Sequence, residues 1–221
     1  MTIFVVCFTV IFSYLFGSLN SAIVVCKILK GQDIREYGSK NAGLTNVLRV
    51  YGKGPAAVTL ILDLVKGIVA VMICWLVAYF CDVELFADPL FVKYLAAVFV
   101  MLGHVFPLYY GFKGGKGVLL TCTTLMAIDP LTCALALSVF IILVAITRYV
   151  SVGSIFGAIA YPVFTWITQS MRDYENFVIN GMCALLICII IIFKHRANIV
   201  RLFNGTESKL SFKKKDSSDE G

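Results

Sequence analysis

Long apolar segments separated by short polar loops constrain this 221-residue chain more than any other feature. A helix needs about 20 apolar residues to cross the roughly 30 Å hydrocarbon core of a bilayer. The segments that meet or approach this length are residues 3–28, 55–80, 91–110, 118–128, 131–147, 152–170 and 177–193. The sequence therefore predicts an all-α integral membrane protein, built as a bundle of seven transmembrane helices.

The length fits one compact bundle, so we expect no separate soluble domain. Only 14% of the residues are charged, whereas a soluble domain carries about 25%. We expect one transmembrane domain over residues 1–207 and a disordered cytoplasmic tail over residues 208–221. Segment 118–128 is the shortest predicted span, because a helix of that length reaches only about 17 Å.

Charge placement predicts the orientation of the bundle. If every predicted span crosses the membrane, sixteen of the nineteen lysines and arginines fall on one side. These are Lys27, Lys30, Arg35, Lys40, Arg49, Lys53, Lys113, Lys116, Arg148, Lys194, Arg196, Arg201, Lys209, Lys213, Lys214 and Lys215. The opposite loops carry Asp82, Glu84, Asp88, Asp129, Asp173 and Glu175. The positive-inside rule then places the basic loops and the C-terminus in the cytoplasm and the N-terminus outside.

The first basic loop interleaves cations with small and amide residues. Its candidate anion-binding residues are Ser39, Asn41, Thr45, Asn46 and Arg49. Hydroxyl, amide and backbone N–H groups donate to an anion, and a guanidinium matches the oxygens of a phosphate. The alternative is a polar turn that joins two spans, with Thr45 or Asn46 capping a short helix. The segment taken alone leaves both readings open.

The second basic loop, residues 111–117, is rich in glycine and leads directly into segment 118–128. A glycine-rich turn at a helix N-terminus presents free N–H groups and the positive end of the helix dipole. The expected phosphate ligands are Lys113, Gly114, Gly115 and Lys116. The loop is not a Walker A motif, because Gly117 stands where a serine or threonine would bind magnesium. The alternative role of the lysines is to anchor a helix end at the interface.

The third basic segment follows the last predicted span. If the helix continues, His195, Asn198 and Arg201 recur every three residues and share a face. The alternative is a juxtamembrane basic segment that binds anionic lipid, which requires only positive charge. A histidine and an asparagine in register with an arginine therefore indicate a site.

Ionisable residues also lie inside predicted spans, where they are rare and have paired or functional roles. Asp63 and Lys66 are three residues apart, so we expect an ion pair that supports the site, with substrate contact as the alternative. His104 is either a core histidine bonded to a backbone carbonyl or a catalytic one. The eight cysteines show no CxxC spacing, so we predict no metal, disulfide or cofactor.

Three phosphate-seeking segments beside a lipid-facing bundle predict a protein that handles a phosphate headgroup and an acyl tail. The aromatic residues fit a belt at the membrane interface, and nothing indicates a nucleic-acid partner. Together the segments resemble the bacterial acyl-phosphate:glycerol-3-phosphate acyltransferases, the PlsY family. The resemblance rests on residues 17–21, 33–39, 41–49, 63–67, 103–107, 112–118, 195–202 and 205–207, which occur in the family's order.

The resemblance implies a seven-helix enzyme of the cell inner membrane with a cytoplasmic active site. The family acylates glycerol 3-phosphate from acyl phosphate and forms lysophosphatidic acid in the first step of phospholipid synthesis. Matching residues of the site would be Ser39, Arg49, Lys113, Lys116, His195 and Asn198, with Glu207 in support. Lys40 stands where the family commonly has glycine, and Leu44 where alanine is usual. Contact with the enzyme that produces acyl phosphate is also expected.

The expected mechanism is direct attack on a mixed anhydride, which demands neither an acyl-enzyme nor a metal. The glycine-rich loop with its two lysines would hold one phosphate, and Arg49 with Ser39 the other. His195, oriented by Asn198, is the candidate base for the glycerol 1-hydroxyl; alternatively a substrate phosphate takes the proton. Competing functions are an organic-phosphate transporter, for which no internal repeat is evident, and a non-enzymatic lipid-binding protein.

Overall fold

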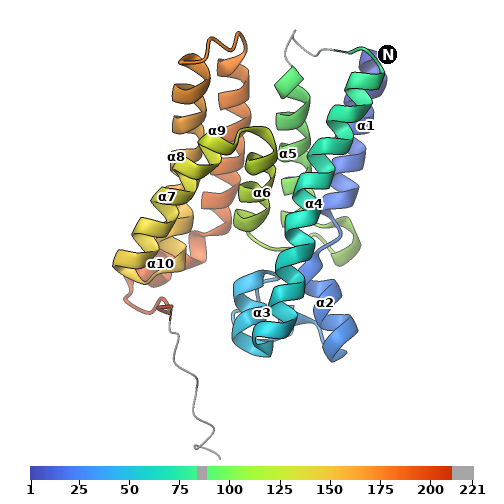
Figure 1. Cartoon of the computed structure of the whole chain (residues 1–221). Coiled ribbons are helices and arrows are strands. Elements are labelled where there is room, and N and C mark those ends of the chain that lie inside the picture. Colours follow the sequence, from blue (N-terminus) through green and yellow to red (C-terminus); the bar gives the residue numbers. More distant parts are fainter. Residues whose placement is uncertain (84–88, 211–221) are drawn as a thin grey trace, which may run out of the picture.

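The computed structural model describes residues 1–83 and 89–210, and within these ranges it contains helices and no strand. The long helices run up and down beside one another (Figure 1). The prediction of an all-α bundle is therefore confirmed. Glu84 and Asp88 of the predicted acidic loops, and residues 211–221 of the predicted tail, lie outside the described residues.

The helices follow the predicted apolar segments closely. They are α1 (Thr2–Gly17), α2 (Ser21–Lys30), α3 (Leu44–Tyr51), α4 (Lys53–Phe80), α5 (Pro89–Val105), α6 (Val118–Ile128), α7 (Pro130–Thr147), α8 (Val150–Ser170), α9 (Phe177–Lys194) and α10 (Arg196–Phe203). Two 3-10 turns, Ile34–Glu36 and Leu108–Tyr110, lie in the connections. Of the described residues, six helical stretches are long and apolar enough to cross a membrane. The fourth predicted span, residues 118–128, corresponds to α6, which has the predicted bounds and is shorter than a membrane-spanning helix.

The first predicted span is not one continuous helix. It is interrupted between Gly17 and Ser21, and the Asn20 side chain caps α2 by accepting a hydrogen bond from the Ile23 N–H at 3.1 Å. The interruption frees the carbonyl of Leu19, which accepts a hydrogen bond from the Lys66 ammonium at 3.0 Å. A charged side chain of α4 thus satisfies backbone that the helix break exposes inside the protein.

α1 and α5 approach each other at two glycines. A Cβ added to Gly17 would clash with the Val100 carbonyl oxygen, and one added to Gly103 would clash with that of Tyr14. Small residues at such crossings let helix backbones come close, which favours association in a membrane. The Tyr14 hydroxyl further links the two helices by donating to the Phe106 carbonyl at 3.0 Å.

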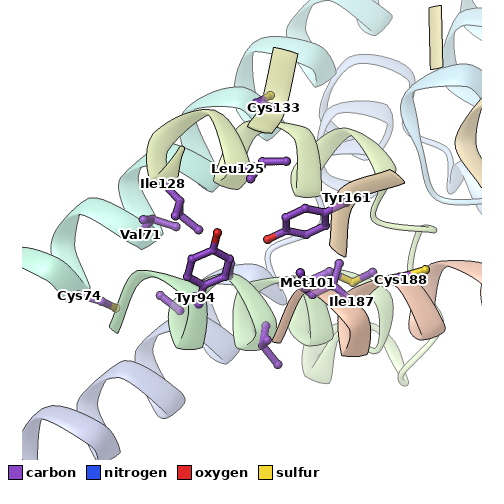
Figure 2. Close-up of a cluster of buried hydrophobic side chains, with 14 of the residues drawn as sticks. Val71, Cys74, Tyr94, Met101, Leu125, Ile128, Cys133, Tyr161, Ile187 and Cys188 are labelled. Carbon is purple, nitrogen blue, oxygen red and sulfur yellow. The ribbon is translucent and has the colours of Figure 1, made fainter. Parts of the chain in front are cut away.

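Buried apolar side chains of α4, α5, α6, α8 and α9 fill the centre of the bundle. Figure 2 shows Tyr94 and Tyr161 among Leu125, Met101 and Ile187. The polar tip of Tyr94 is not left unpaired, because its hydroxyl accepts a hydrogen bond from the Gln169 side chain at 2.7 Å. This dense layer supports α6, whose N-terminus follows the glycine-rich loop.

Asp129 makes the turn between α6 and α7. Its carboxylate caps α7 by accepting from the N–H groups of Leu131 and Thr132 at 3.1 and 3.3 Å. It also pairs with Arg172 at 3.3 Å and accepts from the Thr132 hydroxyl at 2.7 Å. The carboxylate is therefore fully engaged although it is almost completely buried.

The three basic segments gather toward one end of the bundle (Figure 1), which we call the loop end. It contains the connection from α2 to α3, the glycine-rich residues 106–117, and α10 with the residues that follow it. Segments far apart in the sequence are thereby placed to build one site.

The α1–α5 crossing gives a direct test of the packing. Gly103→Ala should lower the free energy of unfolding by about 1–3 kcal/mol, because the new methyl group overpacks the contact with Tyr14. The control is Gly54→Ala in the first turn of α4, where an added Cβ meets nothing within 4 Å. The control should be neutral or stabilising by up to about 1 kcal/mol. Equal melting temperatures for both variants in detergent would contradict the assigned crossing.

Candidate functional site

The first basic loop is organised by Asn46, which is buried. Its amide oxygen accepts from the Ser39 N–H at 2.9 Å, and its amide nitrogen lies 3.0–3.2 Å from the carbonyl oxygens of Ile34, Tyr37 and Asn41. The side chain is thus occupied by loop backbone and is not placed to contact phosphate, in contrast to the sequence expectation. It holds the loop so that other residues face outward.

Four of the predicted phosphate-seeking side chains are exposed and uncommitted. In residues 1–83 and 89–210, the side chains of Ser39, Thr45, Arg49 and Lys113 make no hydrogen bond or ion pair with protein groups. Cations held without a counter-charge at the surface attract anions strongly. These residues are therefore available to a phosphate ligand.

The glycine pair of the second loop has a different role from the one expected. The N–H groups of Gly114 and Gly115 donate to the carbonyls of Val105 and His104, both at 3.2 Å, so they do not cradle a phosphate. Glycine is required there by close packing. A Cβ on Gly114 would clash with the His104 carbonyl, and one on Gly115 would lie 2.7 Å from the Ala42 carbonyl oxygen. The pair therefore seats the second loop against α5 and the first loop.

Arg35 joins the first and second loops, a role that we did not predict. Its guanidinium donates to the carbonyls of Tyr110 and Lys113 at 2.7 and 3.2 Å. Asp33 fixes the guanidinium through a second fork, with bonds of 2.7 and 3.0 Å. This contact lowers the pKa of the Asp33 carboxyl, chiefly by the hydrogen bond from Arg35. The sequence signal was the Asp-x-Arg spacing, which suits a bidentate pair.

Lys113 also borders an open cavity of about 440 Å³ on this surface. The cavity is lined by Asp33, Arg35, Glu36, Tyr110, Gly111 and Lys113. None of these lining residues belongs to the third basic segment, and the lining side chains carry charges of both signs.

The third segment meets the second loop through Asn198. The Lys116 ammonium donates to the Asn198 amide oxygen at 2.5 Å, and the Asn198 amide nitrogen donates to Glu207 at 2.7 Å. Glu207 also pairs with Arg201 at 2.6 Å. Four predicted site residues are thus connected in one continuous chain of charge-assisted hydrogen bonds.

His195 lies where the helix is interrupted between α9 and α10, so the condition of a continuous helix through this residue is not met. Its ring is buried and its Nδ1 lies 2.8 Å from the Ile191 carbonyl, which can only accept a hydrogen bond. The proton of the neutral ring is therefore on Nδ1, and Nε2 carries a lone pair. The Ile191 carbonyl, not the predicted Asn198, orients the imidazole.

Burial controls the protonation of both central residues. It lowers the pKa of His195 to about 4, and the neighbouring Lys116 cation acts in the same direction. Burial also lowers the pKa of Lys116 to about 8, opposed by Glu207 and assisted by the positive charges of Arg201 and Arg49. At neutral pH, therefore, a neutral imidazole lies beside a charged lysine.

Comparison with known proteins assigns the chain to a family. The family model described as glycerol-3-phosphate acyltransferase matches residues 7–205. The chain belongs to the glycerol-3-phosphate acyltransferase family. A family protein of Clostridioides difficile is 39% identical over 97% of this chain and 100% of its own length. One of Pseudoalteromonas translucida is 41% identical over 92% of each chain.

Solved structures agree with the assignment to the acyltransferase family. The chain resembles PlsY (YgiH), an integral membrane glycerol 3-phosphate acyltransferase, in its glycerol 3-phosphate form. The TM-score is 0.78 at 31% identity, covering 93% of this chain and 96% of that chain. The lysophosphatidic acid form of the same protein gives a TM-score of 0.75 at 29% identity, with 93% and 95% covered.

Lys40 has a backbone conformation that favours glycine. Its φ of 57° lies in the left-handed region, as does the φ of 58° at Gly38, two residues earlier. A non-glycine residue costs roughly 1–2 kcal/mol in this conformation. The lysine therefore lowers stability at this turn and adds a cation to the loop end.

The pKa of Lys116 predicts a pH dependence of substrate binding. If Lys116 binds phosphate, as the sequence predicts, only its ammonium form can do so. Because its pKa is lowered to about 8, the KM of a phosphate substrate should then rise as pH increases through 8. In Lys116→Arg the KM should stay flat from about pH 7 to about pH 9.5, since arginine remains charged. Steady-state kinetics across this range test both statements. A parallel rise in the two enzymes would assign the titration to another group.

Proposed function

We propose that the chain transfers an acyl group from acyl phosphate to the 1-hydroxyl of sn-glycerol 3-phosphate. The products are lysophosphatidic acid and phosphate, as expected of a membrane acyltransferase in phospholipid biosynthesis. The observation that carries this proposal is the placement of neutral His195 beside the Lys116–Asn198–Glu207 chain at the loop end. The family membership supplies the acceptor, glycerol 3-phosphate.

Two phosphate groups are accommodated by two sets of cations. Lys113 and Lys116 approach from the second loop, whereas Arg49 and Ser39 belong to the first. Asn41, Thr45 and Arg201 supply further donors at the rim, with Arg201 already paired to Glu207. Holding both substrates in one orientation removes much of the entropic barrier to a two-substrate reaction.

The transfer needs one bond to form and one to break. The glycerol 1-oxygen attacks the acyl carbonyl carbon, and the carbon–oxygen bond to the leaving phosphate breaks. The lone pair on His195 Nε2 accepts the hydroxyl proton, because Nδ1 is committed to Ile191. Since the pKa of this imidazole is only about 4, the departing phosphate is the competing proton acceptor. Fixed cations stabilise the charge that develops on oxygen.

The charge of the loop end supports a proposal for the orientation in the membrane. We place this end in the cytoplasm and the N-terminus outside, in the inner membrane, because the segments that carry most of the basic residues lie at this end (Figure 1). Counting α6 as a short seventh crossing makes successive helices alternate in direction. The exposed loop end then also faces the enzyme that produces acyl phosphate, with which we propose contact.

The choice of acyl donor is the first prediction to test. Purified protein should form lysophosphatidic acid from labelled glycerol 3-phosphate and palmitoyl phosphate, and none from palmitoyl-CoA. Lys116→Ala should reduce kcat/KM by at least about 100-fold, because a charge-assisted contact to phosphate and the link to Asn198 are both lost. The matched control Lys53→Ala removes an exposed lysine at the start of α4 and should retain activity.

Product from palmitoyl-CoA would overturn the donor assignment. If folded protein forms no product from either donor, the loop end would be a binding site without chemistry, as in a transporter.

Replacing His195 tests its role as a base. His195→Ala should lower kcat about 100- to 10,000-fold, the range attributed to general-base catalysis, while the KM for glycerol 3-phosphate changes little. Near-normal turnover in the folded variant would remove the imidazole from the chemistry and leave a substrate phosphate as the proton acceptor.

A further inference from the structure

A cluster of buried ionisable side chains lies beneath the glycine-rich loop and takes no part in the chemistry described above. Asp63 and Lys66 come from one face of α4, and His104 from the last turn of α5. Their exposed fractions are 2%, 5% and 4%. Charges this deep in a membrane protein are costly and are kept where they have a function. The predicted Asp63–Lys66 ion pair is confirmed, with a separation of 3.2 Å.

The surroundings of Lys66 determine the tautomer of His104. The ammonium nitrogen lies 3.2 Å from the Asp63 carboxylate, 3.0 Å from the Leu19 carbonyl and 3.3 Å from Nδ1 of His104. An ammonium has three N–H donors and no lone pair. His104 Nδ1 must therefore accept the third hydrogen bond, which leaves the proton of the neutral imidazole on Nε2.

Asp63 fixes the position of the ammonium. The same carboxylate oxygen that faces Lys66 accepts a hydrogen bond from the Ser21 hydroxyl at 2.7 Å. Ser21 is the first residue of α2, so the carboxylate is held from a second helix. The Leu19 carbonyl, which the break before α2 leaves free, is a further hydrogen-bond acceptor for the Lys66 ammonium.

The other ring nitrogen of His104 faces the meeting point of the two phosphate-seeking loops. A Cβ on Gly115 would clash with Nε2 and would lie 2.7 Å from the Ala42 carbonyl oxygen. In the part of the chain that the structure describes, no protein group accepts a hydrogen bond from Nε2. Gly115 is followed directly by Lys116, whose ammonium binds Asn198.

We propose that Asp63, Lys66 and His104 form a positioning relay for the phosphate-binding lysine. The ion pair fixes the imidazole with its Nε2–H directed at the junction of Ala42 and Gly115. The imidazole in turn sets the spacing between the first loop and the Lys116 loop. The inference rests on the proposed function, and all three are positioning residues, because none of them touches the reacting atoms.

Two replacements of His104 separate the ring nitrogens. Glutamine places an amide N–H near the position of Nε2, whereas asparagine places its amide near Nδ1. His104→Asn no longer fills the space beside Gly115 that Nε2 occupies, so the spacing of the two loops is lost and the KM of a phosphate substrate should rise about tenfold. His104→Gln should restore that KM to within about threefold of the original enzyme, and kcat should change little in both. Equal KM values in the two variants would overturn the relay.

A double variant separates positioning from simple structural support. Asp63→Asn with Lys66→Met removes both buried charges, which avoids an unpaired charge and preserves stability. The relay predicts a melting temperature near that of the original enzyme together with the raised KM of His104→Asn. If the double variant has both the melting temperature and the KM of the original enzyme, or if all these variants unfold, the ion pair is purely structural and the proposal is overturned. Inactivity of the unaltered enzyme with palmitoyl phosphate would instead overturn the proposed function.

Discussion

Backbone polar groups find no water in the hydrocarbon core of a bilayer, and this constraint determines where the chain can be irregular. The long segments are helical because a helix satisfies its own N–H and C=O groups. Irregular backbone is concentrated in residues 31–43, 106–117 and 204–210, which lie toward the loop end (Figure 1). Glycine-rich turns, exposed cations and a buried imidazole consequently occur together, beside a bundle that faces lipid.

Much of the fold was predictable from the length of apolar runs. The bounds of α6 were predicted without error, and the ends of α4, α7, α8 and α9 differ from prediction by at most two residues. The Asp63–Lys66 pair also followed from spacing, since residues three apart share a helix face. The break before α2 was missed because Ser18 and Asn20 are two polar residues in an apolar run. Their effect depends on Asn20 finding the Ile23 N–H.

The candidate site was predictable as a set of residues, whereas the roles of its members were less so. Lys116 and Asn198 are 82 positions apart, so no local pattern indicates that they bond. Gly114 and Gly115 looked like a phosphate cradle because their N–H groups were assumed to be free. In the structure those groups bond to α5. Likewise Asn46 is an apparent ligand in the sequence and an internal scaffold in the fold.

The turn between α6 and α7 lies well short of the level reached by the α8–α9 connection (Figure 1). A backbone reversal at such depth is tolerated only where protein covers it. Asp129, Thr132 and Arg172 provide that cover. Their polar groups are already bonded to one another, so they cannot pair with the backbone of added residues. Loop-length variation among related chains should therefore be absent at this turn and permitted where α8 joins α9. The architecture thus restricts insertions at the α6–α7 turn far more than at the α8–α9 connection.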